Sequence, residues 1–89
     1  MALYGNDFSK VFSQLIEKAG ISCYQIAHFA HLDQAYLSRL RNSERQNPSP
    51  ETIIKISLAL THYSDKIQLY DIHRLFRSVG RSLHLKDDY

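Results

Sequence analysis

Two short helix-forming segments follow each other in the middle of this 89-residue sequence, and only about three residues separate them. The first has Ser22 as its N-cap and Gln25 three residues later, the pair that forms a capping box. The second starts at Asp33, another residue type that caps helices. A link this short forces the two helices to cross at a steep angle. The crossing requires a small residue where the helices touch, and Ala27 meets that need.

Apolar residues at helical spacing predict three further helices around this pair. One starts after residue 6 or 7 and ends at Gly20, a common C-terminal stop. Another starts at the cap Ser49, which Pro50 and an acidic residue follow. The last is predicted to open at residue 64 or 65 and to stop at Gly80. With three glycines, two prolines and no alternating strand-like run, the chain is predicted to be an all-α, compact five-helix bundle.

The composition is that of one folded intracellular domain. An apolar fraction of 44% excludes a disordered chain, and eleven basic against nine acidic residues give only a weak preference for anionic partners. The single Cys23 excludes an intramolecular disulfide and suits a reducing compartment. No apolar stretch approaches the roughly 18 residues of a membrane span, and the N-terminus lacks a signal pattern. We therefore expect a cytoplasmic protein without a membrane partner.

Four segments carry a resemblance to a known family through their order and spacing: residues 20–27, 36–40, 47–49 and 56–60. They resemble the Cro and phage-repressor type of helix-turn-helix protein, an XRE-like family. The resemblance covers roughly residues 8–63 and implies a lambda-repressor-like bundle whose second and third helices form the helix-turn-helix. The whole chain, 1–89, is then one domain. Its C-terminal helix and tail, residues 64–89, form a candidate dimerisation element.

The resemblance also implies which side chains meet DNA. It assigns base-edge contacts to Gln34, Ala35, Ser38 and Arg39, on the outer face of the third helix. The chemistry agrees, because Gln pairs with adenine, Arg pairs with guanine and Ala contacts the thymine methyl group. Residues 34–50 carry a local charge of +2. Phosphate contacts are predicted for Tyr36, Arg41, Asn42 and Arg45, and for the amino end of the fourth helix at Glu51 and Thr52, where unpaired amides are expected.

Two positions depart from the family pattern. Family members usually have Gly at the turn position that His31 occupies, and that position often needs a positive φ, which His adopts less readily. We therefore expect a strained or differently wound turn. The family usually has a phosphate-binding Gln where Cys23 stands. We expect that contact to be missing or left to backbone amides.

Other chemistry has little support in the sequence. His28 and His31 lie three residues apart, near Asp33, but zinc prefers three or four ligands and no second cluster is evident. Cys23 would need an oriented base and a pocket to act as a nucleophile, and a chain of this size rarely supplies them. We expect no catalytic residue, no metal and no cofactor; an enzyme-associated or metal-binding module is the weakest alternative.

A second basic group, without an acid between its members, consists of Arg74, Arg77, Arg81 and Lys86. Arg74 and Arg77 share a helix face. This group is interpreted as a solvated surface, with an extra DNA contact or a steering field as the alternatives. The same region carries the apolar residues of the candidate dimer surface, which are Leu69, Tyr70, Ile72, Leu75, Phe76, Leu83 and Leu85.

The sequence therefore predicts a DNA-binding transcription regulator, most simply a repressor that occludes a promoter. The resemblance implies a two-fold homodimer on palindromic double-stranded DNA, with half-sites about one helical turn, roughly 34 Å, apart. One alternative stays open. An antitoxin or interaction adaptor would use the same scaffold to hold a partner protein.

Overall fold

The computed structural model describes residues 7–45 and 47–80, and within these ranges the chain forms five helices and no strand. This confirms the predicted all-α, five-helix bundle. The helices are α1 (Asp7–Ala19), α2 (Cys23–Ala30), α3 (Gln34–Arg41), α4 (Pro50–Tyr63) and α5 (Leu69–Arg77).

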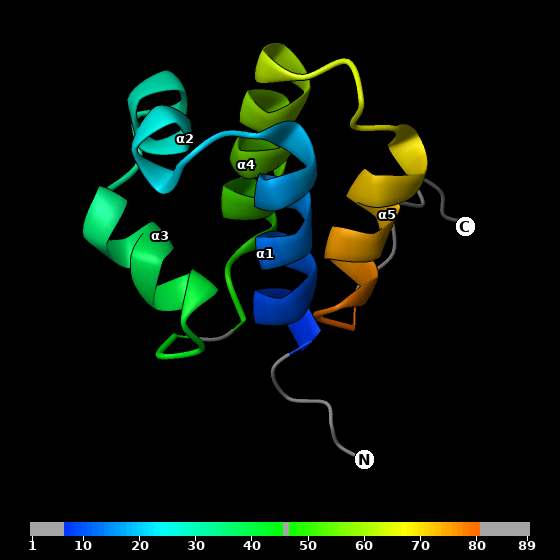
Figure 1. The fold of residues 1–89 in the computed structure, drawn as a ribbon. Helices are drawn as coiled ribbons and strands as arrows, with labels where there is room; N and C mark the ends of the chain where they lie inside the picture. Colours follow the sequence, from blue (N-terminus) through cyan, green and yellow to red (C-terminus); the bar gives the residue numbers. More distant parts are fainter. Residues whose placement is uncertain (1–6, 46, 81–89) are drawn as a thin grey trace.

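The two longest helices, α1 and α4, form the centre of the bundle (Figure 1). On one side α2 packs against α4, and α3 packs against α1 and α2; on the other side α5 packs against α1 and α4. The helix pair α2–α3 and the helix α5 therefore lie on opposite sides of the centre. Any surface formed by α3 is separate from a surface formed by α5.

Every helix contributes side chains to one apolar core, which explains why short helices hold their places. Each large aliphatic or aromatic side chain that is fully buried stabilises the fold by about 1.5–3 kcal/mol. The fully or almost fully buried members of the core include Phe8, Phe12, Leu15, Ile16, Ile26, Leu37, Leu40, Ile53, Ile56, Leu60 and Leu75.

The predicted start of the last helix was wrong. Residues 64–68 connect α4 to α5, and α5 begins only at Leu69. Ser64 has an extended backbone and donates its N–H to the Leu60 carbonyl, so it ends α4 rather than starting α5. The N–H group of Gln68 donates instead to the Asp71 carboxylate, 2.9 Å away, and this bond caps α5.

Some residues of the predicted dimer surface contribute to the chain's own core instead. Leu75 is fully buried in the chain's own core, whereas Ile72 and Phe76 are mostly buried there and expose only a small part of their surface, in a hollow between α4 and α5. Leu69 and Tyr70 are largely exposed. The predictions for Leu83, Leu85, Arg81 and Lys86 fall outside the described residues.

Candidate nucleic-acid interface

The N-terminus of α2 is held by the predicted capping box. The Ser22 hydroxyl accepts the Gln25 N–H at 3.2 Å, and the Gln25 side-chain oxygen accepts the Ser22 N–H at 3.0 Å. Two amides that lack a partner within the helix are therefore satisfied locally. This fixes the residue at which α2 begins.

The turn between α2 and α3 contains the left-handed residue that the sequence analysis anticipated. His31 has φ 57° and ψ 45°, and its N–H donates to the Ala27 carbonyl. The Leu32 N–H donates to the same carbonyl at 3.0 Å. His31 thus adopts the positive φ that this position often needs in the family, so the turn is not wound differently. The two hydrogen bonds offset the strain of a non-glycine residue in this region of backbone space.

Helix α3 is oriented by its inner face and by its cap. Leu37 and Leu40 have no solvent exposure, so one side of the helix is fixed against the core. The Asp33 carboxylate accepts the Ala35 N–H at 3.3 Å, which confirms Asp33 as the N-cap. The opposite side of the helix must then face away from the bundle.

The four predicted base-contact residues lie along that outer side at helical spacing. Gln34, Ala35 and Arg39 are exposed and Ser38 is half-buried. None of the four belongs to the core. The arrangement therefore presents an amide, a methyl and a guanidinium group on one accessible stripe, with the half-buried Ser38 hydroxyl at its edge beside the Cys23 thiol; their contact with DNA stays a prediction.

Two of the residues predicted to contact phosphates, Asn42 and Arg45, lie in the loop that follows α3. The guanidinium carbon of Arg45 lies 5.7 Å from the centre of the Tyr36 ring, within cation–π range. The N–H groups of Glu44 and Arg45 both donate to the Arg39 carbonyl, at 2.8 and 3.2 Å. These bonds fold the loop back onto α3. Arg45 and the C-cap Asn42 are both exposed there.

Arg41 is the last residue of α3, as predicted, and its side chain lies toward α2. Its backbone carbonyl accepts a hydrogen bond from the Ser9 hydroxyl of α1, and its half-buried side chain reaches the Cys23 thiol at the start of α2. Burial raises the pKa of that thiol, and the charge of Arg41 with hydrogen bonds from Arg41 and Ser38 only partly offsets the effect. A cation therefore stands beside the amino end of α2. No local pattern in the sequence signals this long-range placement.

The amino end of α4 offers fewer free amides than expected. The Ser49 hydroxyl accepts the Thr52 N–H at 3.1 Å, and Pro50 has no N–H. The expectation that Thr52 presents an unpaired amide was therefore wrong, because its own N-cap residue already uses it. The exposed Glu51 carboxylate lies 3.4 Å from Lys55 Nζ. The Thr52 hydroxyl oxygen accepts a hydrogen bond from the Ser49 hydroxyl at 3.0 Å, so the Thr52 hydroxyl can still donate its own hydrogen to another group.

The basic residues of this surface carry charge that is not paired with acids. Across residues 8–45 and 47–80, the ion pairs are Lys18–Asp71 and Lys55–Glu51. Arg39, Arg41 and Arg45 take part in neither. An anion that approaches α3 therefore meets the exposed Arg39 and Arg45 and the half-buried Arg41, against two exposed acids, the N-cap Asp33 and Glu44.

The part of the chain that the structure describes lacks both a cluster of metal ligands and a membrane-length helix. It contains no group of three or more His, Cys, Asp or Glu residues that could hold a metal ion. None of the described helices is both long and apolar enough to pass through a membrane.

Comparison with known proteins agrees with this geometry. A helix-turn-helix family model matches residues 13–61, more than half of the chain, and the match includes α2, the turn at His31 and α3. Comparisons with curated proteins and with solved structures gave no significant match.

Proposed function

This chain belongs to the Cro-type helix-turn-helix family of DNA-binding transcription regulators, and from that premise we propose that it is a sequence-specific repressor. Helix α3 enters the major groove of double-stranded DNA in the cytoplasm and occludes a promoter. The observation that carries the proposal is the outer stripe of α3, which is accessible because Leu37 and Leu40 hold the opposite side in the core.

Sequence reading is assigned to the stripe itself. Arg39 pairs with guanine through its two parallel N–H groups, Gln34 pairs with adenine and Ala35 contacts a thymine methyl group. The Ser38 hydroxyl can donate a hydrogen bond to a base edge or accept one from it, so it can contact either base of a pair. Each good bidentate pair contributes about 1–3 kcal/mol of discrimination against the wrong base.

Positioning on the duplex is assigned to the residues around the stripe. Asn42 and Arg45 follow the carboxyl end of α3, and the Arg45 guanidinium lies beside the ring of Tyr36, in the first turn of the helix; the three contact one phosphate strand. Arg41, beside Cys23, provides a cation at the amino end of α2, where the family usually has a Gln. The proposal keeps Glu51 and Thr52 as phosphate contacts, through the Glu51 amide and the Thr52 hydroxyl.

The test is a selection of DNA sequences from a random library with the purified full chain. We expect enrichment of a palindromic motif whose half-sites lie about 34 Å apart. A library that stays random after selection, while the protein retains its helical content, would contradict base reading by α3.

The proposal includes a two-fold homodimer formed through α4 and α5. An apolar hollow of about 270 Å³ lies between these helices, and Ile54, Leu58 and Leu69 on its rim are about half or more exposed. A contiguous exposed apolar patch on so small a chain is typical of an interaction surface. A second copy is the occupant we commit to, because a two-fold dimer suits a palindromic operator.

Sedimentation of the purified chain at tens of micromolar tests this part. A dimer supports it, and a monomer contradicts it. Co-purification of a second, different chain seated on this surface favours the antitoxin or adaptor role in place of the homodimer. A DNA-binding antitoxin would still give an enriched motif in the selection, so the two experiments are independent.

A further inference from the structure

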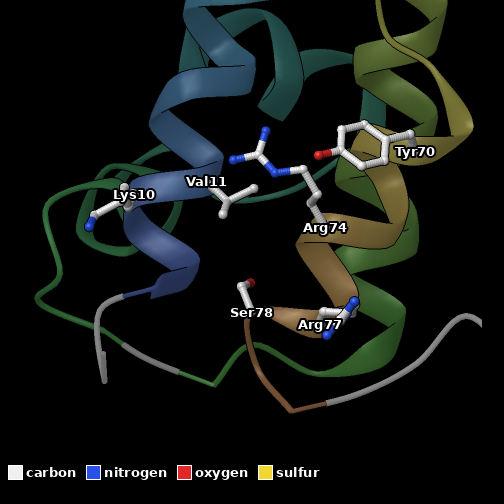
Figure 2. A pocket seen from close by; sticks show the side chains of 6 residues that line it. All are labelled: Lys10, Val11, Tyr70, Arg74, Arg77 and Ser78. Atoms are coloured by element: carbon white, nitrogen blue, oxygen red, sulfur yellow. The ribbon is translucent and has the colours of Figure 1, made fainter. Parts of the chain in front are cut away.

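A hollow of about 340 Å³ lies between α1 and α5, on the side of α1 away from α3 (Figures 1 and 2). It collects three cationic side chains and no carboxylate, and neither the helix-turn-helix nor the apolar dimer surface explains this. The lining residues are Lys10, Val11, Tyr70, Arg74, Arg77 and Ser78.

The cations of this hollow have no acid as an ion-pair partner among the residues the structure describes. The nearest acid on α5, Asp71, is buried and already binds Lys18 Nζ at 2.8 Å and the Gln68 N–H at 2.9 Å. The positive charge of Arg74 also lowers the pKa of Asp71, but less than Lys18 does. Among the side chains of residues 8–45 and 47–80, no carboxylate therefore neutralises the positive charge that faces the hollow.

The hollow also contains unused hydrogen-bond donors. Arg74 donates one N–H to the Gln14 side-chain oxygen, which leaves four of its five N–H groups. Arg77 and the Tyr70 hydroxyl have no side-chain partner within the described ranges, whereas the Ser78 hydroxyl donates to the Leu75 carbonyl at 2.6 Å. Figure 2 shows the Arg74 side chain and the Tyr70 hydroxyl close together, with Lys10 on the α1 side pointing outward.

Helix electrostatics explain only part of this arrangement. Arg74 and Arg77 lie in the last turn of α5, where cations are favoured by the helix dipole. The amino end of α1 lies beside this turn, and its partial positive charge opposes that dipole (Figure 1). The dipole accounts neither for Lys10 on the α1 side of the same hollow nor for the Tyr70 hydroxyl beside Arg74.

We propose that this hollow binds the phosphate monoester of a small organic molecule. Arg74, Arg77 and the Tyr70 hydroxyl hold the phosphate oxygens, since guanidinium groups bind such oxygens in pairs. Lys10 adds long-range charge. Val11 and the exposed ring of Tyr70 face the organic part. The volume exceeds what a phosphate alone requires and lies at the lower end of the range for small-ligand sites, about 300–1,000 Å³.

This binding site is independent of the proposed DNA contacts, because α1 separates it from α3 (Figure 1). Its test is a titration of the isotope-labelled full chain with AMP and, separately, with inorganic phosphate, followed by amide NMR. We expect saturable shifts confined to residues around the hollow, with AMP binding more tightly than phosphate. Equal affinity for the two probes would contradict an organic subsite.

Matched variants separate a built site from general attraction to a basic protein. We expect Arg77→Ala to weaken AMP binding by about tenfold or more, since it removes a charged hydrogen-bonding group. Tyr70→Phe keeps the ring and should weaken binding by a smaller factor. Lys66→Ala removes the same charge from an exposed position in the α4–α5 connection, outside the hollow, and should leave binding unchanged.

Three results would overturn the proposal: shifts that do not saturate, shifts spread over every basic residue, or an equal loss of affinity in Arg77→Ala and Lys66→Ala. A short DNA duplex that shifts the amides around the hollow while AMP does not would assign the cations to the DNA backbone instead. Circular dichroism of each variant confirms that it is folded. Arg77 is exposed, so its replacement should not disturb the core.

Discussion

Lys18 Nζ lies 2.8 Å from the Asp71 carboxylate and so joins the end of α1 to the first turn of α5 across 53 positions of sequence. The carboxylate is only 2% exposed, and it also accepts the Gln68 N–H. One buried side chain thus starts α5 and attaches it to α1.

Asp71→Ala should destabilise the protein by about 1–3 kcal/mol, because it uncaps α5 and leaves Lys18 without its partner. The half-exposed Lys18 can regain water, which limits the loss. Urea unfolding measures the change. The control is Asp65→Ala, an exposed position, which should stay within about 0.5 kcal/mol of the parent. Equal losses of stability in Asp71→Ala and Asp65→Ala would show that the Asp71 carboxylate contributes no more to the fold than an exposed one.

The same carboxylate predicts how stability depends on pH. Burial acts to raise the pKa of Asp71, but hydrogen bonds from Lys18 and Gln68 and the charges of Lys18 and Arg74 outweigh it, so the pKa lies below its ordinary value. The stabilisation is fully present above the unfolded pKa, about 3.9, and is lost as pH falls through the folded pKa. Urea unfolding between neutral and acid pH should show a smaller acid loss in Asp71→Asn than in the parent protein.

His31→Gly should stabilise the protein by about 0.5–1 kcal/mol. The left-handed backbone costs a non-glycine residue about 1–3 kcal/mol, and the greater freedom of glycine in the unfolded chain cancels part of the gain. Thermal or urea unfolding measures the effect. His28→Gly, three residues earlier inside α2, should instead destabilise by roughly 0.5–1 kcal/mol. If both variants lose stability, the turn at His31 is not strained.

Arg39→Ala and Arg45→Ala should weaken DNA binding in different ways. Loss of Arg39 should cost about 1–3 kcal/mol on the selected sequence and little on random DNA, because it removes a base contact. Loss of Arg45 should weaken binding to the selected sequence and to random DNA similarly. It should also reduce the slope of log affinity against log salt concentration by about one unit. Fluorescence anisotropy at several salt concentrations measures both. An equal effect of Arg39→Ala on every sequence would show that it does not read bases.

Leu58→Asp should shift the protein from dimer to monomer with little loss of folding stability. Leu58 is 57% exposed on the rim of the α4–α5 hollow, so a buried carboxylate arises only in the dimer. Sedimentation equilibrium gives the dimer dissociation constant. Lys55→Gln, on the same helix but outside that hollow, lowers the net charge by the same one unit and is the control. An unchanged dissociation constant in Leu58→Asp would place the subunit contact elsewhere.

The start signals of α2, α3 and α4 could be predicted from the order of residues because each depends on a hydrogen bond between near neighbours. Ser22 with Gln25, Asp33 with Ala35, and Ser49 with Thr52 all lie within three positions of each other. The outward stripe of α3 follows from the same local rules, since helical spacing separates it from Leu37 and Leu40.

Features that join distant parts of the chain could not be predicted in this way. Ser64 and Asp65 have the residue types of a helix cap, yet α5 starts later because Asp71 meets Lys18 on another helix. Packing also turned Arg41 toward Cys23 and brought Lys10 beside Arg74 and Arg77. Local caps and periodicity therefore determine where these helices form and which way they face, whereas contacts between charges on different helices depend on how the helices pack.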